Sequence, residues 1–318
     1  MKALTSNSPL QFAALRIGVA LTILFKIYSE FDQLDLLYSK TGIIQDFVSR
    51  PLQVSYIISL PKFIDFLGIS NEHNFLSALY LLFGFSAFCL LIGLKTRINV
   101  AICLFIHLLV FNGYSLLTFG FDGFLFTLLF YSLLFPIGRV WSLDNLIHSS
   151  KKPIDLAYMN ICFNVLQLHL CIVYFTAGVA KFGGQQWMDG TAIWSAINQP
   201  QFYSMFTDFF KDLISRPGVS AIFSWTTLFV EMLFPVLIWI KWGRVRVLIL
   251  LSVILMHVFI GAVMGLQLFA WIMIVFDLSA FGGVFGSVYC AIKMKITKFQ
   301  RFSPKPTALT IYLPGKVN

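Results

Sequence analysis

The stretch VYFTAGVAKFGGQQWMDG, Val173–Gly190, ends a long apolar segment that begins at Tyr158. One lysine, Lys181, stands where the apolar run stops, and two glycines and a Trp-x-Asp-Gly corner follow it. A segment of this length can cross the roughly 30 Å hydrocarbon core of a bilayer as a helix. The lone amine at its rim is either an interface anchor or a reactive base.

The composition of the whole chain is that of a membrane protein. Of its 318 residues, 58% are hydrophobic and 12% are charged, and the mean hydropathy is +0.82. Soluble domains carry about a quarter charged residues. The net charge of +9 comes from basic residues that flank apolar runs, which predicts a topology signal and not a nucleic-acid-binding surface. The five cysteines show neither CxxC nor metal-ligand spacing, so we expect buried thiols, no disulfide framework and no metal site.

Apolar runs long enough to span a bilayer recur along the chain, and they predict an all-α membrane protein, a bundle of about eight transmembrane helices. Arg16 interrupts the first run and no small-x-small cleavage site follows it, so we expect this run to remain as the first span. The eight runs cover approximately residues 9–28, 75–94, 98–118, 121–137, 158–180, 219–240, 247–265 and 268–290.

Basic residues gather on one predicted side of the bundle, for example in Lys95–Arg97, Lys241–Arg246 and Lys293–Arg301. The positive-inside rule then places both termini in the cytoplasm and the protein in the inner (plasma) membrane. Residues 1–290 would form the transmembrane bundle, and 291–318 a basic cytoplasmic tail. The segments 29–74 and 182–217 would lie on the outer side as interfacial helices, because their apolar stretches are too short to span.

Ionisable and polar side chains within the apolar runs are functional candidates, because burial in lipid costs several kcal/mol unless the group is paired or faces a cavity. Each also has a structural interpretation. Arg16 would pair with Glu231 or Asp122, and Asp277 would be solvated near the cytoplasmic end of the last run. The candidates are Arg16, His107, Asn112, Asp122, His169, Lys181, Glu231, His257 and Asp277.

Three polar residues of the fifth run, Gln167, Tyr174 and Lys181, are spaced by seven. This spacing places them on one face of a helix. Gly178, on the neighbouring turn, would let another helix or a ligand approach closely. Lys181 on that face is either a partly desolvated base or a lysine that extends to the interface. No Ser-His-Asp order, HExxH, phosphate loop or paired-carboxylate motif is present.

The stretch around Lys181 resembles the corresponding helix of the HTTM family, whose best-known member is vitamin K-dependent gamma-glutamyl carboxylase. Further stretches match this family in order. They are PLQFAALRIGVAL (Pro9–Leu21), LLIGLKTRI (Leu90–Ile98), the region of Asn112, VWSLDNL (Val140–Leu146) and the helix histidine, His257. The resemblance covers nearly the whole chain.

The resemblance implies a base and a cofactor. In the carboxylase the lysine of the AGV-x-K position deprotonates reduced vitamin K, and Lys181 matches that lysine. A reduced quinone is therefore the implied cofactor. Gly113 follows Asn112 where the carboxylase has a histidine, and we expect no large non-cytoplasmic domain in this chain. The side chains expected to line the cavity beside Lys181 are Arg16, Asn112, Gln167, Tyr174, Glu231 and His257.

Two functions stay open, and a third possibility is an inactive descendant that keeps only the fold. The chain is either a lysine-based, quinol-linked or peptide-modifying membrane enzyme, or a non-catalytic factor for maturation or export of a secreted antimicrobial peptide. The second function follows from the short bacterial members of the family, which resemble the sporulation-delaying protein B type. The expected partners are the lipid bilayer, a secreted peptide and a partner membrane or redox protein.

Overall fold

The computed structural model describes residues 7–44, 48, 57–147, 154–216 and 218–286, and within these ranges every regular element is a helix. The all-α prediction is confirmed there. Six helical segments are long and apolar enough to cross a membrane. They are Leu10–Tyr38, which contains α1 (Leu10–Glu30), and then α5 (Glu72–Ile92), α6 (Thr96–Gly113), α9 (Leu156–Phe182), α13 (Val219–Leu237) and α14 (Gly243–Met264).

Two shorter apolar helices, α7 (Gly120–Leu134) and α15 (Gln267–Phe281), occupy the remaining two predicted runs. Each has 15 residues, which at a rise of about 1.5 Å per residue gives about 22 Å, less than the bilayer core. Both run alongside the longer helices, and α15 packs against α1, α9 and α14. The count of eight spans therefore remains a prediction.

Local signals set the ends of the helices, as α5 illustrates. The Asn71 side chain accepts a hydrogen bond from the Asn74 backbone N–H at 3.0 Å, which caps the first turn. Gly93 ends the helix in the left-handed region, at φ +74°. A Cβ at Gly93 would also lie 2.8 Å from Ser142 Cα. Both the backbone conformation and the close approach thus require glycine at this position.

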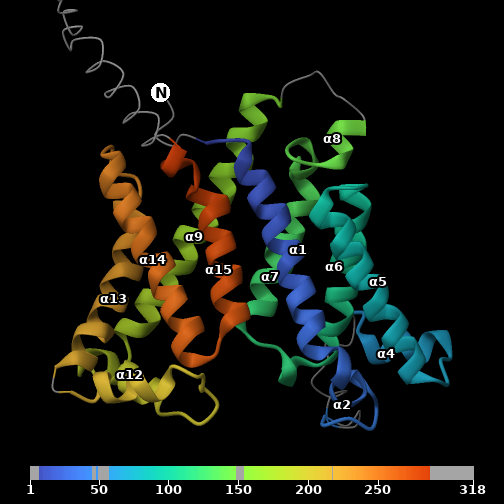
Figure 1. Ribbon diagram of the computed structural model, residues 1–318, viewed down its shortest axis with the longest axis horizontal. Coiled ribbons are helices and arrows are strands. Elements are labelled where there is room, and N and C mark those ends of the chain that lie inside the picture. Colours follow the sequence, from blue (N-terminus) through green and yellow to red (C-terminus); the bar gives the residue numbers. More distant parts are fainter. Residues whose placement is uncertain (1–6, 45–47, 49–56, 148–153, 217, 287–318) are drawn as a thin grey trace, which may run out of the picture.

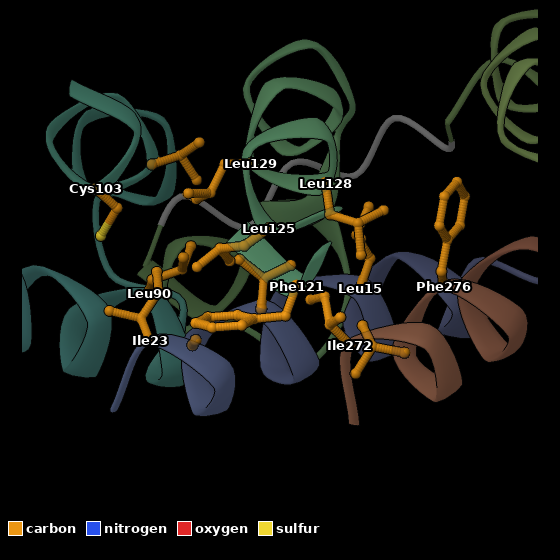
Figure 2. Close-up of a cluster of buried hydrophobic side chains, with 14 of the residues drawn as sticks. Leu15, Ile23, Leu90, Cys103, Phe121, Leu125, Leu128, Leu129, Ile272 and Phe276 are labelled. Atoms are coloured by element: carbon orange, nitrogen blue, oxygen red, sulfur yellow. The ribbon is translucent and has the colours of Figure 1, made fainter. Parts of the chain in front are cut away.

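The apolar core is built around α1, which packs against α5, α7 and α15 (Figure 1). Figure 2 shows part of this core, where side chains from five helices meet. Helix α9 continues the bundle by packing against α13 and α15, and α13 packs against α14. The core side chains labelled in Figure 2 include Leu15, Ile23, Leu90, Cys103, Leu125 and Ile272. Cys103 is one of four described cysteines, all of them buried and free, as predicted.

Short helices close the two ends of the bundle (Figure 1). One end carries the segments that the sequence predicts to lie outside. They are η1 (Phe31–Gln33), α2 (Leu34–Tyr38), α4 (Leu60–Leu67), α10 (Gln185–Met188), α11 (Ala192–Ile197) and α12 (Thr207–Ile214). The opposite end carries η4 (Ile137–Arg139) and α8 (Leu143–Ile147), and η3 (Ser115–Leu117) joins α6 to α7. The predicted tail, 291–318, lies outside the described residues.

Candidate functional site

Lys181, in the last turn of α9, forms an ion pair with Glu231 of α13. Its Nζ lies 2.6 Å from Glu231 Oε2 and 5.5 Å from the centre of the Trp187 ring. The Lys181 side chain is 25% exposed and the Glu231 side chain is 8% exposed. The amine is therefore not isolated, and the two groups form one acid–base unit at the end of an apolar helix.

Gly178, one turn before Lys181, sets the spacing between α9 and α13. A Cβ at Gly178 would lie 3.1 Å from the backbone nitrogen and 3.3 Å from the Cα of Met232. The Met232 Cγ would lie closer still, at 2.6 Å, which real Cβ contacts essentially never show, so Met232 packs directly against the glycine and no side chain fits at position 178. Gly178 thus allows the close helix packing that the sequence predicts. This packing brings Glu231 of α13 level with the last turn of α9.

A second buried polar group lies one to two turns further into the bundle. The Tyr174 hydroxyl is 2.9 Å from Asp277 Oδ1 and 3.1 Å from Asp277 Oδ2. His257 Nδ1 lies 3.9 Å from Asp277 Oδ2 and donates to the backbone carbonyl of Val253 at 2.8 Å. All three side chains are buried. The structure thus brings the predicted residues Tyr174, Glu231, His257 and Lys181 onto neighbouring turns of α9, α13 and α14, and Asp277 of α15 joins them.

A separate ionic cluster joins α1 to α7. Lys26 Nζ lies 2.7 Å from Glu30 Oε1 and 3.2 Å from Asp122 Oδ1. Glu30 Oε2 also accepts hydrogen bonds from Tyr38 at 3.0 Å and from Tyr80 at 2.9 Å. The Lys26 side chain is only 4% exposed. This cluster fixes α1, α2, α5 and α7 to one another at the end that the sequence predicts to be outer.

Three predicted site residues lie apart from Lys181 in other environments. The Asn112 amide donates to Ile58 O at 3.3 Å, at the end of α6, and Figure 1 places α6 and α14 on opposite sides of α1. Gln167 donates to Ala280 O at 2.7 Å, two turns before Tyr174. Arg16 donates to a backbone carbonyl, that of residue 141, at 2.5 Å.

Two structural expectations about buried charges were wrong. Arg16 does not pair with Glu231 or Asp122, because Lys181 holds the first carboxylate and Lys26 holds the second. Asp277 is not solvated, because it lies within α15 and is 0% exposed. An acidic residue inside an apolar run was the signal that pointed to Asp277 as a site residue, and the sequence alone did not say how far it lay from the membrane surface.

Sequence reasoning missed the role of Lys26. This residue falls at the end of the first apolar run, where a lysine that extends to the interface is the ordinary interpretation. The available signal was the spacing of four between Lys26 and Glu30, which places opposite charges on one helix face. Within the described residues, no group of three or more His, Cys, Asp or Glu side chains could hold a metal ion.

Comparison with known proteins places this arrangement in a family. The model of one protein family, the HTTM domain, matches residues 10–281. The chain belongs to the HTTM family. Both the Lys181–Glu231 pair and the Lys26 cluster lie within the matched residues of the HTTM domain.

One curated relative of this HTTM protein has a name that states no function. It is the uncharacterized protein YitO of Bacillus subtilis (strain 168), which is 28% identical over 147 residues. The alignment covers 44% of this chain and 47% of the relative, so the chain matches about half the length of that protein. No solved structure matches the chain.

Proposed function

We propose that this HTTM protein is a multi-pass membrane enzyme in which the Lys181–Glu231 pair removes a proton from a reduced quinone. The observation that supports the proposal is the 2.6 Å contact between Lys181 Nζ and Glu231 Oε2. The carboxylate is nearly buried while a quarter of the lysine side chain stays exposed. A substrate dissolved in the bilayer would approach the amine without the carboxylate being released into water.

The pair suits proton removal from a weak acid in an apolar environment. Lys181 passes a proton to Glu231 across the 2.6 Å contact and accepts one from the substrate hydroxyl. The pair then consists of an ammonium and a neutral carboxylic acid, the form of Glu231 that a low dielectric favours. Once the substrate hydroxyl has lost its proton, the lysine ammonium lies beside the new oxyanion. It then stabilises that charge more strongly than it would in water.

A reduced quinone is the substrate class that the family resemblance implies. It is apolar, it resides in the bilayer, and it carries two weakly acidic hydroxyl groups. Its oxygenation balances with dioxygen alone. The quinol loses two protons and four electrons, two on reaching the quinone level and two as its ring double bond becomes an epoxide. Dioxygen accepts the four electrons as its O–O bond breaks, and one oxygen atom forms the epoxide while the other takes the two protons and leaves as water. The protein's own residues supply the first step, the removal of a hydroxyl proton.

The proposal is tested with the full chain in lipid nanodiscs that contain a reduced naphthoquinone. Dioxygen consumption and quinone epoxide are measured for the wild type, Lys181→Ala, Glu231→Gln and the control Lys211→Ala. Lys211 is a matched control because its amine also lies over an aromatic ring, that of Tyr203, at 5.9 Å. We expect both changes to the pair to lower turnover by about 100-fold or more, as is typical for the loss of a general base, and the control to be unaffected.

Two results would overturn the proposal. The first is a wild-type protein that forms no epoxide and consumes no dioxygen above nanodiscs without protein. The second is turnover that survives Lys181→Ala and Glu231→Gln. The first result would favour the non-catalytic role in maturation or export of a secreted peptide.

We also propose that α7 and α15 cross the membrane, so that the bundle has eight spans with both termini in the cytoplasm. Their apolar sequences and their packing among the longer helices support this. A topology reporter fused after Ile147 tests α7. It is expected on the cytoplasmic side, opposite to a reporter fused after Ser39, whereas the same side for both would show that α7 does not cross.

A further inference from the structure

Asp277 is a carboxyl group deep in the bundle with one hydrogen-bonding neighbour among the described side chains. That neighbour is Tyr174, whose hydroxyl is within 2.9 Å and 3.1 Å of the two carboxyl oxygens. Asp277 is 0% exposed. It lies in the last third of α15, the helix that packs against both α9 and α14. A group of this kind is a functional candidate, because an isolated buried charge costs many kcal/mol.

The surroundings of Asp277 favour a neutral carboxylic acid over a carboxylate. Among the described side chains, the candidate counter-ion beside Asp277 is His257. Its Nδ1 lies 3.9 Å from Asp277 Oδ2, beyond hydrogen-bond distance. That nitrogen donates to Val253 O instead, at 2.8 Å. Lys181, the cation of this region, is already bound by Glu231. A carboxylate here would thus be buried without a partner that neutralises it, whereas a proton neutralises it and needs no space.

Tyr174 lies between Asp277 and the Lys181–Glu231 pair. Tyr174 and Lys181 are seven residues apart on one face of α9, with Gly178 and its contact to α13 between them. On α13, Phe234 lies three residues after Glu231, and its ring centre is 4.5 Å from that of Tyr174. Tyr174 therefore stands about two turns from Lys181 along α9 and about one turn from Glu231.

We propose that Asp277 is a neutral acid which donates its proton in a hydrogen bond to the Tyr174 oxygen, so that the Tyr174 hydroxyl can donate to the oxyanion formed at the Lys181–Glu231 pair. This inference rests on the proposed function. Asp277 is then a positioning residue and Tyr174 contacts the substrate. A tyrosine and a neutral carboxylic acid together stabilise an oxyanion well, because both are donors that an apolar site keeps uncharged.

The hydrogen-bond chain changes no covalent bond. The substrate O–H bond breaks and its proton goes to the pair. The resulting oxyanion accepts a hydrogen bond from Tyr174, whose oxygen in turn accepts one from Asp277. An asparagine at position 277 keeps an uncharged donor of the same shape, and a leucine keeps only the volume.

The test compares Asp277→Asn with Asp277→Leu and Tyr174→Phe in the same nanodisc assay, with kcat and KM measured separately. We expect Asp277→Asn to stay within about threefold of the wild type, and the other two variants to lose about 10-fold to 100-fold in kcat, as for loss of an oxyanion donor. Infrared difference spectra at neutral pH add a readout of protonation. The carbonyl stretch of a neutral carboxyl group is expected in the wild type and is expected to be absent in Asp277→Asn.

The outcomes separate this inference from the proposed function. If the wild type turns over quinol, but Asp277→Asn falls as far as Asp277→Leu and no neutral carboxyl band is lost, Asp277 is ionised and the inference is wrong while the function stands. If the wild type shows no turnover, the function and this role both fail. Should Asp277→Leu not fold, the infrared band, Asp277→Asn and Tyr174→Phe still decide.

Discussion

Replacement of Lys26 by methionine is expected to lower the free energy of unfolding by about 3–5 kcal/mol, the usual result of removing one partner from a buried ion pair. The Lys26 ammonium lies between Glu30 and Asp122 at 2.7 Å and 3.2 Å, and its side chain is 4% exposed. Methionine fills a similar volume, so the expected loss comes from two carboxylates that remain in the bundle without their cation. Unfolding in mixed micelles of rising SDS fraction, followed by circular dichroism, measures the loss.

Lys40 offers a matched control for Lys26, because it also bridges two carboxylates. Its Nζ lies 2.8 Å from Asp65 Oδ1 and 3.2 Å from Glu72 Oε1, but its side chain is 35% exposed. The hydrogen bond to Asp65, together with Glu72, raises the pKa of Lys40. We nevertheless expect Lys40→Met to cost only about 0–1 kcal/mol, because water already solvates this amine. Equal losses for the two variants would show that Lys26 is not held in a buried pair.

The second large effect is expected at Lys181 and Glu231, and it is unequal between the partners. Lys181→Met leaves the nearly buried Glu231 carboxylate without its cation, and we expect a loss of about 2–3 kcal/mol. Glu231→Leu leaves an amine that is 25% exposed and can turn toward water, so we expect a loss of about 1 kcal/mol.

The double variant tests whether the two residues act as a unit. Lys181→Met combined with Glu231→Leu is expected to recover part of the loss, with a coupling energy of about 1–2 kcal/mol between the sites. The same micelle unfolding measurement gives all four corners of the cycle. Strictly additive losses would mean that the 2.6 Å contact does not contribute to stability.

Much of the architecture could be predicted from the sequence, because helices that cross lipid can be recognised by the length and hydropathy of their apolar runs. Each predicted run contains an apolar helix, and the described parts of the two segments expected to lie outside form short helices at one end of the bundle. Two of these helices, α7 and α15, have only 15 residues each and are shorter than the runs that predicted them. The run predicted for α7, 121–137, was longer because apolar residues of the turn after Leu134 extend it, and the run predicted for α15, 268–290, ends outside the described residues.

The partners of the buried charges could not be predicted in the same way. Periodicity places Tyr174 and Lys181 on one face of a helix, but it does not say which helix that face meets or at what level. Glu231 is 50 residues from Lys181 and meets it only because α9 and α13 pack closely. The expected pairing of Arg16 with Glu231 or Asp122 was wrong for the same reason. Asp277 was expected near the membrane surface because a run of apolar residues does not show how deep each residue lies in the bundle.

The contact at Gly178 makes the site selective for side-chain length. Helices α9 and α13 already touch at this glycine, so they cannot move closer to compensate for a shorter side chain. The distance that the pair must bridge is therefore set by the backbones, and a lysine and a glutamate together match it. Aspartate at position 231 would keep the charge and lose one methylene of reach. The 2.6 Å contact would lengthen to about 4 Å, beyond hydrogen-bond distance, so the spacing at one glycine dictates which acid can serve at position 231.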